Sequence, residues 1–340
     1  MADKRLILAV AGSGKTKYLI DHLNLDKRFL IVTYTNTSLD LIKSRIIKKF
    51  GYLPTNIKTQ TYFEFIYGFC IKPFVLFKYN LKGIYWEPSP EFTTFLSNTN
   101  SNKYLTKNRY LYHNRLGKFV EFENIIEDIK KRLEKFYDHF FYDEFQDLGG
   151  HDFNFITSIA QANIDFLFVG DFFQNTYVTS YDGKVNGTLY SDLNEYCSKL
   201  KANNVQIDTE TLGNSFRCSP TICSFISKNL VISIDSNRKD ETSIIKIEDR
   251  ETAFKIIENN SIIKLVYDKS NERNFYAKNW GECKGEDDYN DTCIILNKTT
   301  AKIFSKNKFD ELKPRTKNKL YVALTRTRGN CYLIEDDLIQ

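Results

Sequence analysis

The first half of the chain alternates short apolar runs with longer amphipathic segments. The apolar runs are rich in β-branched and aromatic residues, and they cover Arg5–Val10, Phe29–Thr35, Ile57–Tyr62, Phe140–Asp143 and Phe166–Asp171. Helix-compatible segments follow most of these runs. Such alternation predicts a parallel sheet with helices on both faces and with ligands bound beyond the carboxyl ends of its strands.

A second series of strand-like runs follows, at Val205–Leu212, Ile244–Glu248, Ile262–Tyr267, Thr292–Leu296 and Cys331–Ile334. The segment from about Cys70 to Asp138 lacks this rhythm and ends in a charged, helix-like stretch, Glu121–Phe136. The sequence therefore predicts an α/β protein with a first domain at residues 1–69 and 139–204, an inserted subdomain at 70–138, and a second domain at 205–340.

Composition excludes several classes of protein. The chain has 340 residues, of which 42% are hydrophobic and 15% aromatic, so it can bury sizeable cores and is not a disordered chain. No run approaches the roughly 18 apolar residues of a membrane span. Seven cysteines without a C-x-x-C pair, beside four histidines, favour reduced thiols over a disulfide framework or a zinc site. With no signal-peptide pattern at the start, we expect an intracellular protein, cytoplasmic or nucleoid-associated, or in a host cytoplasm if of mobile-element origin.

Charge is distributed unevenly along the chain. The formal net charge is +5, yet the stretch from Cys70 to Val120 contains eight Lys and Arg residues and only two Glu, with aromatic residues interleaved. Basic side chains neutralise phosphates and aromatic faces stack on bases, which is the usual chemistry of single-strand binding. A basic insertion with an aromatic core and no ligand explains the same pattern, and both interpretations stay open.

A phosphate-binding loop follows the first apolar run. The segment Ala9–Thr16 reads A-V-A-G-S-G-K-T and opens the helix-compatible stretch Lys15–Leu23. Small residues allow backbone N–H groups to wrap phosphates at the start of a helix. We therefore expect nucleotide binding by Ala11, Gly12, Ser13, Gly14, Lys15 and Thr16, with Lys15 on the β and γ phosphates and Thr16 on Mg²⁺.

Carboxylates end the run that begins at Phe140. The segment Phe140–Asp147 reads F-F-Y-D-E-F-Q-D, so its acidic side chains come at the carboxyl end of a predicted strand. We expect Asp143 to hold the Mg²⁺ shell and Glu144 to polarise the water that attacks the γ-phosphate. A solvated acidic turn would explain this cluster if it stood alone, but the loop at residues 9–16 favours a shared site.

These motifs and several others occur in the order found in superfamily 1 helicases of the UvrD/Rep/PcrA type, and the chain resembles that family over nearly its whole length. The matching segments are Ile31–Asn36, Lys58–Thr61, Asp143–Asp147, Val169–Tyr177, Asn214–Arg217, Lys284–Asp288 and Tyr321–Arg328. The resemblance implies two tandem RecA-like P-loop NTPase domains with parallel sheets and a small insertion in the first. It also implies ATP and Mg²⁺ as cofactors, and stepping along single-stranded or tailed DNA in the 3′→5′ direction.

The resemblance also assigns roles to residues outside the loop. Gln174 would sense the γ-phosphate, and Arg217 and Arg326 would place positive charge on the transition-state phosphoryl oxygens. Phe216 stands where the family stacks a tyrosine on adenine, and Asp287 where a glutamate contacts the ribose. The DNA contacts implied are Thr33, Tyr34, Thr35, Thr59 and Tyr177.

Four departures from the family limit this transfer. Eight residues precede Ala9, which leaves no room for the family's adenine-reading glutamine motif. Thr179 stands where a base-stacking tryptophan is expected, and Asp287 has a shorter reach than the expected glutamate. Only 67 positions separate Arg217 from Lys284, so the large second insertion of the family is missing.

Two functions follow from this pattern, and a third is disfavoured. The first is a DNA-dependent ATPase and helicase. The second is a nucleic-acid sensor, or a motor subunit for a nuclease or another protein partner, with little unwinding of its own; the missing second insertion supports it. A P-loop kinase acting on a small molecule needs no second set of arginine motifs and does not explain the segment Asp143–Asp147.

Overall fold

A six-stranded sheet forms the centre of the first part of the chain. In the computed structural model, which describes residues 2–176, 184–286, 289–306 and 308–339, the strand order is β3-β2-β6-β7-β1-β8. The pairs β2–β3, β2–β6, β6–β7 and β1–β8 are parallel. The strands are β1 (Lys4–Leu8), β2 (Phe29–Thr33), β3 (Ile57–Thr61), β6 (His139–Tyr142), β7 (Asp165–Gly170) and β8 (Gln206–Asp208).

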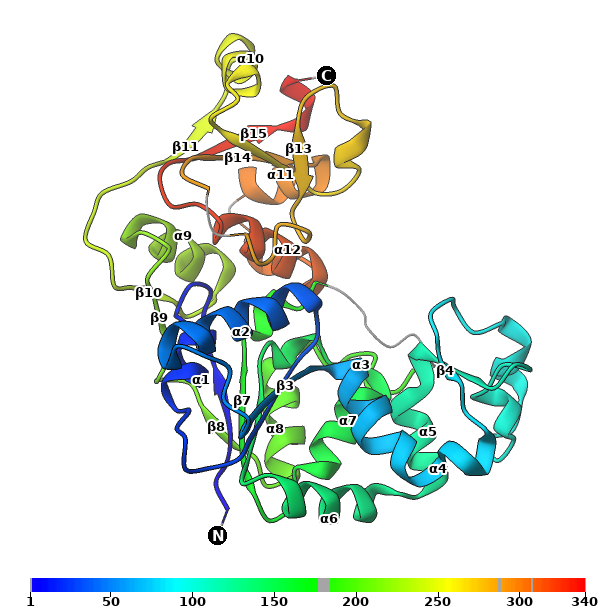
Figure 1. Cartoon of the computed structure of the whole chain (residues 1–340). Coiled ribbons are helices and arrows are strands. Elements are labelled where there is room, and N and C mark those ends of the chain that lie inside the picture. The colour runs from blue at the N-terminus through cyan, green and yellow to red at the C-terminus, as the bar shows by residue number, and fades with distance from the viewer. Residues whose placement is uncertain (1, 177–183, 287–288, 307, 340) are drawn as a thin grey trace. The chain divides into compact units, whose positions relative to one another are not determined.

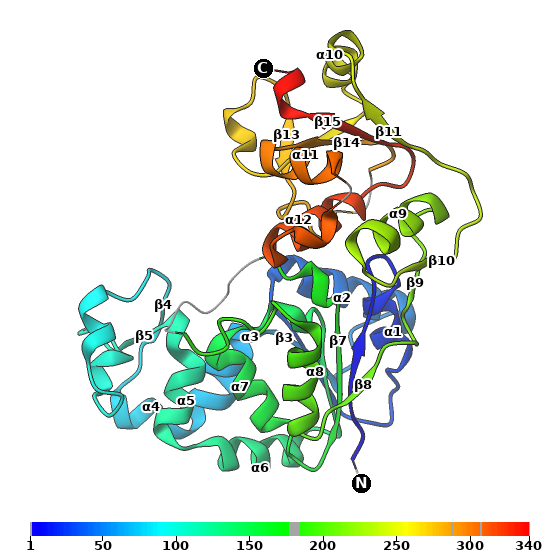
Figure 2. The same ribbon diagram turned by 180° about the vertical axis from the view of Figure 1, so that it is seen from behind.

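Helices cover both faces of this sheet. Figure 1 and Figure 2 show α1 and α2 on one face and α7 and α8 on the other. Their bounds are α1 (Lys15–Asp21), α2 (Asn36–Phe50), α3 (Tyr62–Glu64), α7 (Gly150–Ile159) and α8 (Leu193–Ala202). All residues of β2 are buried, which explains why it appears in the sequence as a continuous apolar run rather than an alternating one.

The predicted insertion leaves the sheet after β3 and returns at β6. It begins with a π-helical segment, Phe65–Ile71, and carries a small parallel sheet of two strands. Its elements are α4 (Lys72–Tyr79), β4 (Gly83–Tyr85), β5 (Tyr110–Tyr112), α5 (Leu116–Glu123) and α6 (Ile126–Phe136). The charged stretch 121–136 is thus two helices, because Asn124 adopts a left-handed conformation (φ 55°) that ends α5.

A five-stranded parallel sheet, in the order β11-β15-β14-β12-β13, forms the centre of the second part. Its strands are β11 (Ile244–Ile247), β12 (Ile263–Val266), β13 (Ala277–Asn279), β14 (Thr292–Leu296) and β15 (Cys331–Glu335). The helices are α9 (Pro220–Leu230), α10 (Arg250–Glu258), α11 (Lys298–Ser305) and α12 (Pro314–Leu324), and β9 (Asn214–Ser215) pairs with β10 (Asp235–Ser236).

Successive residues of β14 face opposite sides of the second sheet. Ile294 and Leu296 pack with residues of α9 and α12, whereas Cys293 and Ile295 pack with residues of α10. This alternation follows from the two-residue period of a strand and buries both faces of the sheet.

The chain divides into two compact units that cross its predicted boundaries. The first unit contains residues 1–7, 16–170 and 178–208; the second contains residues 8–15, 171–177 and 209–340. The strand-like run at 205–212 contains β8, which pairs with β1 in the first sheet. Its placement in the second series was therefore wrong, because periodicity identifies a strand but not its partner. Among the described residues, no helix is long and apolar enough to cross a membrane.

A buried carboxylic acid links the insertion to the first sheet's helices. Asp152 on α7 is 2% exposed, and its Oδ1 has no hydrogen-bond partner among the described residues. An ideal Cβ on Gly117 of α5 would lie 2.7 Å from this oxygen, so only glycine allows the two helices to approach this closely. Burial raises the pKa of Asp152 to about 7, although the Tyr62 hydroxyl and the Gly117 N–H favour the charged form.

We expect Asp152→Asn to stabilise the protein above neutral pH. The folded-state pKa lies above the unfolded value, so the native acid keeps its proton while the unfolded one loses it. Stability is therefore lost as pH rises from about 4 to about 7. The full change from 3.8 to about 7 corresponds to at most about 4 kcal/mol. Thermal unfolding between pH 5 and pH 8 should show the Tm advantage of Asp152→Asn growing with pH, with exposed Asp40→Asn as the control. A constant difference would contradict the assignment.

Candidate functional site

The loop after β1 has the backbone that a phosphate cradle requires. Gly12 and Gly14 lie at φ 73° and 88°, a region that glycine occupies without strain. The Ser13 N–H and hydroxyl both donate to the Val10 carbonyl, at 3.3 and 2.8 Å, and so close the turn. Lys15, only 8% exposed, then begins α1. The predicted residues Ala11–Gly14 therefore lie in one tight turn, and Lys15 and Thr16 begin the helix that follows it.

The loop threonine meets the carboxylate at the end of β6. The Thr16 hydroxyl donates to Asp143 Oδ2 at 2.8 Å, and Asp143 is 2% exposed. The Asp143 N–H donates to the Val32 carbonyl at 2.9 Å, which extends the β2–β6 ladder and fixes this residue. A hydroxyl beside a carboxylate is an oxygen donor set that suits Mg²⁺, which is bound through few protein groups and keeps several waters. These two residues therefore fit the ion predicted from sequence.

Glu144 is held in a strained conformation beside this pair. It adopts left-handed backbone angles (φ 59°, ψ 47°), which cost a residue with a side chain of order 1 kcal/mol or more. Its carboxylate accepts a hydrogen bond from the buried Gln146 side chain. An ideal Cβ on Gly170 would lie 2.7 Å from Gln146 Oε1, so glycine makes room for this amide. Gln146 and Gly170 belong to matched segments, but neither was assigned a role from sequence.

In the second unit, Tyr321 joins the phosphate loop to Asp171. The Ala11 N–H donates to the Tyr321 hydroxyl at 3.0 Å, and that hydroxyl donates to Asp171 Oδ2 at 2.9 Å. Tyr321 and Asp171 are 0% and 1% exposed, and burial together with the nearby carboxylate raises the pKa of Tyr321 well above its usual value. The hydroxyl therefore stays protonated. Sequence reasoning missed this role because the partners lie 310 and 150 positions away.

Both candidate arginines lie near the end of α12. Arg217 Nη1 donates to the Thr325 carbonyl at 3.3 Å, and the 1% exposed Arg326 donates to the Val322 and Glu286 carbonyls at 3.3 and 3.1 Å. Backbone oxygens therefore hold both guanidinium groups.

The remaining predicted nucleotide-site residues lie close to the phosphate loop or to Asp171. The Phe216 N–H donates to the Gly12 carbonyl at 2.9 Å, and the Phe216 side chain is 67% exposed, so its ring face is open for stacking. Gln174 is 3% exposed, and its N–H donates to the Asp171 carbonyl at 2.9 Å. The predicted ribose contact Asp287 lies outside the described residues.

Predicted nucleic-acid contacts lie at the carboxyl ends of β2 and β3. Tyr34 is half-buried and stacks on Tyr62, with ring centroids 6.0 Å apart. Thr35 is exposed and caps α2 by accepting a hydrogen bond from the Ser38 N–H at 3.1 Å. Thr33 is 0% exposed, whereas Thr59 is half-buried within β3. The predicted contact Tyr177 lies outside the described residues. The structure thus brings Tyr34 and the start of α2 together, while the Thr33 hydroxyl does not reach the surface.

Solved structures provide the comparison. The chain aligns with an arterivirus nonstructural protein 10 helicase in complex with DNA at a TM-score of 0.52 and 11% identity, over 99% of this chain and 62% of that chain. A crystal structure of arterivirus nonstructural protein 10 gives a TM-score of 0.49 at 13% identity, over 99% of this chain and 61% of that one. No protein-family model and no curated protein sequence matches the chain.

The likeness is one of fold. Together with the parallel sheets, it confirms the predicted α/β fold of RecA-like domains. The chain spans about three fifths of the length of its structural neighbours. The UvrD/Rep/PcrA subfamily and the residue roles stay predictions.

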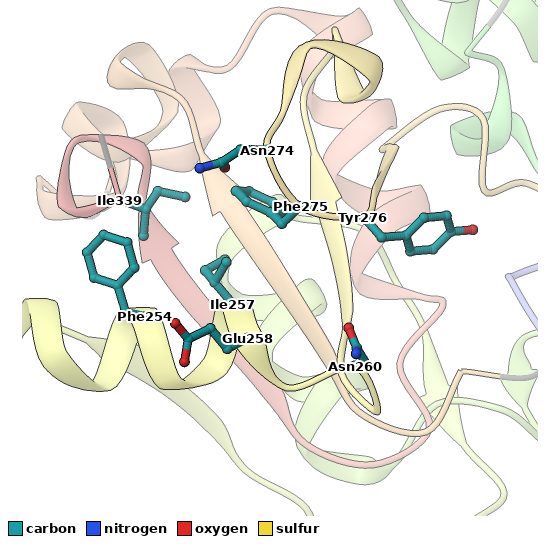
Figure 3. A pocket seen from close by; sticks show the side chains of 8 residues that line it. All are labelled: Phe254, Ile257, Glu258, Asn260, Asn274, Phe275, Tyr276 and Ile339. Carbon is teal, nitrogen blue, oxygen red and sulfur yellow. The ribbon is translucent and has the colours of Figure 1, made fainter.

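A separate cavity of about 370 Å³ lies in the second unit, between α10 and the segment before β13. Figure 3 shows Phe254, Ile257, Phe275 and Ile339 gathered around it, whereas Tyr276 points away from them. Glu258, Asn260 and Asn274 supply its polar lining. No sequence-predicted site residue lines this cavity, so it takes no part in the candidate nucleotide site.

We expect Tyr321→Phe to destabilise the protein by about 1–3 kcal/mol, because it leaves the Asp171 carboxylate and the Ala11 N–H buried without their shared partner. Urea unfolding followed by intrinsic fluorescence measures the effect. Tyr332→Phe on β15 is the matched control, because the Tyr332 hydroxyl makes no hydrogen bond to any described residue. Equal midpoints for the two variants would show that the Tyr321 hydroxyl does not hold the loop.

Proposed function

We propose that the protein is an ATP-dependent nucleic-acid helicase or translocase of superfamily 1. The observation that carries this proposal is the hydrogen bond between the Thr16 hydroxyl and Asp143. It joins a glycine-rich loop after a buried strand to a carboxylate after a second buried strand, which is the pairing of groups that an NTP-hydrolysing site requires. The fold shared with a viral helicase agrees with it.

In the proposed hydrolysis, backbone N–H groups of the loop and the Lys15 ammonium bind the phosphates of ATP. Thr16 and Asp143 would hold Mg²⁺, which neutralises phosphate charge when bound. Glu144 accepts the proton of the attacking water, and Gln146 orients its carboxylate. Gln174 senses the γ-phosphate, and Arg217 and Arg326 stabilise the charge that develops on it.

Recognition of the base and the strand involves a second set of residues. Phe216 offers an exposed ring for adenine, and Asp287 is proposed for the ribose. Single-stranded DNA would run along Tyr34, Thr35 and Thr59, with Thr33 beneath them and Tyr177 further along. The N-terminal end of α2 favours a phosphate there. The structural neighbour solved with DNA supports DNA as the strand. The 3′→5′ direction, the UvrD/Rep/PcrA subfamily and a place in repair or replication are proposed on the sequence motifs.

One specific observation favours a second function. Only two α-helices, α9 and α10, lie between Arg217 and Lys284, a stretch that the structure describes throughout, so the second unit lacks the large insertion of the family. The protein would then serve as a DNA-stimulated sensor or as the motor subunit of a nuclease. Unwinding of duplexes with 3′ or 5′ tails separates the two functions, because a motor subunit alone displaces neither strand while it still hydrolyses ATP.

Single-stranded DNA should stimulate ATP hydrolysis, because a translocase couples strand binding to closure of its nucleotide site. Phosphate release by the purified protein, with and without oligo(dT), measures this coupling. Lys15→Ala is the blank, since it removes the charge that binds the phosphates. Turnover that persists in Lys15→Ala would place hydrolysis outside this loop, and turnover indifferent to DNA would favour the sensor.

Glu144→Gln should bind ATP yet hydrolyse it about 10²–10⁴-fold more slowly, because the amide cannot accept the proton of the attacking water. Filter binding measures affinity, and single-turnover phosphate release measures the chemical step. Exposed Glu91→Gln serves as the matched control. A single-turnover rate near that of the unmodified protein would assign the general base to another residue.

A further inference from the structure

A continuous row of aromatic rings leads from Tyr34 onto the inserted subdomain, entirely within the first unit. Tyr34 meets Phe63 edge-on at 5.5 Å between ring centroids, and Phe63 meets Trp86 edge-on at 4.8 Å. Trp86 in turn lies 6.1 Å from His113, with planes only 25° apart. Phe63 belongs to α3, whereas Trp86 and His113 follow directly after β4 and β5. The row therefore connects the proposed strand path to the small parallel sheet.

Trp86 stays largely exposed although it sits in this row. Its side chain is 59% exposed, whereas Trp280, the other of the chain's two tryptophans, is 0% exposed and donates to the Leu265 carbonyl. A large aromatic ring that packs against Phe63 and His113 and still stays 59% exposed leaves surface on which a nucleic-acid base can stack. Packing alone would not require so much exposed apolar surface.

Cations lie at the opposite end of the same small sheet. The Lys82 N–H donates to the Arg109 carbonyl at 3.0 Å, just before the paired positions Gly83 and Tyr110. Lys82 and Arg109 are both exposed, and neither forms an ion pair with any described carboxylate. Three residues of strand separate them from Trp86 and His113, a span of roughly 10 Å.

We propose that Trp86 is a base-stacking platform that extends the path of single-stranded nucleic acid from Tyr34 onto the inserted subdomain, with Lys82 and Arg109 contacting the phosphates beyond it. This inference rests on the proposed function and adds a binding site to it. A single strand carries bases that stack on an aromatic ring such as that of Trp86, and phosphates that attract cations such as Lys82 and Arg109. Exposed Glu87 next to Trp86 disfavours a phosphate at that point, so a base rather than the backbone faces the ring.

The platform sets the length of strand that the protein contacts. Only two ring contacts separate Tyr34 from Trp86, so a strand of a few nucleotides already covers both, whereas a mononucleotide occupies one position at a time. Loss of the Trp86 ring should therefore weaken binding of an oligonucleotide much more than that of a mononucleotide.

The direct readout is the emission of Trp86 itself. Subtracting the emission of Trp86→Phe from that of the unmodified protein isolates the Trp86 signal, because Trp280 is buried and common to both. Unlabelled oligo(dT) of 20 nucleotides should quench this difference signal, and thymidine monophosphate at the same nucleotide concentration should leave it nearly unchanged. Oligo(rU) of 20 nucleotides separates RNA from DNA as the strand.

Fluorescence anisotropy of labelled oligo(dT) tests the energetics. Trp86→Ala and Trp86→Leu should each weaken binding of the long strand about 5- to 100-fold, whereas Trp86→Phe should retain most of it. Leucine keeps apolar packing against Phe63 without a stacking face, so its failure to rescue excludes a merely structural role. Phe77→Ala is the matched control, because Phe77 on α4 of the same subdomain is 95% exposed.

Replacing Lys82 and Arg109 with Ala should lower the slope of log affinity against log salt by about two.

The outcomes separate this inference from the function on which it rests. Binding of oligo(dT) with no quenching of Trp86, and with equal affinity for Trp86→Ala and Phe77→Ala, would overturn the platform and leave the helicase proposal standing. Full rescue by Trp86→Leu would also overturn it, because the ring would then serve packing alone. Absence of single-strand binding by the unmodified protein, for DNA and RNA alike, would sink both.

Discussion

The hydrogen bond between Thr16 and Asp143 depends on where parallel strands end. Strands β1 and β6 belong to one sheet, so the loop that follows β1 and the carboxylate that follows β6 emerge at the same edge. The Asp143 N–H still donates to the β2–β6 ladder, so the backbone of this residue is fixed and its side chain is less mobile than that of an ordinary surface aspartate. The sheet therefore positions the candidate site, because its strands end where the loop threonine and the carboxylate meet.

Runs of apolar residues predicted the strands well because the strands are buried. The predicted run at residues 29–35 contains β2 and the run at 140–143 covers all of β6 but its first residue, and the residues of both strands are almost all inaccessible to solvent. Strand β8 was placed in the wrong sheet, since a short strand carries no mark of its neighbour. Strand β13 was not predicted, because Ala277–Asn279 is neither apolar nor β-branched. Local pattern thus predicts an element, whereas pairing depends on the rest of the chain.

The candidate site divides in the same way. Loop residues such as Lys15 and strand-end residues such as Asp143 carry a local signal, because glycine spacing and acidic clusters are visible in a few consecutive letters. Tyr321 and Gln146 lie in matched segments, but the letters do not reveal their roles, since each acts through a hydrogen bond to a group that folding brings near. Gly170 shows the same limit. A side chain at this position would collide with Gln146, which belongs to another segment of the sequence. Sequence reasoning finds groups that perform chemistry more readily than groups that hold them.

The first unit also concentrates buried polar groups beneath the proposed strand path. The hydroxyl of Tyr142 is buried without a hydrogen-bond partner among the described residues, and burial raises the pKa of Tyr62 and of Tyr142 well above its usual value. Tyr62 stacks on Tyr34, and Tyr142 directly precedes Asp143. Asp152 faces Gly117 of the insertion. Because interiors are close-packed, a displacement of Tyr62 would move the ring that stacks on Tyr34. This buried layer therefore lies next to the proposed strand path, to the candidate carboxylate Asp143 and to the insertion, so a change in any one of them acts on the same set of packed side chains.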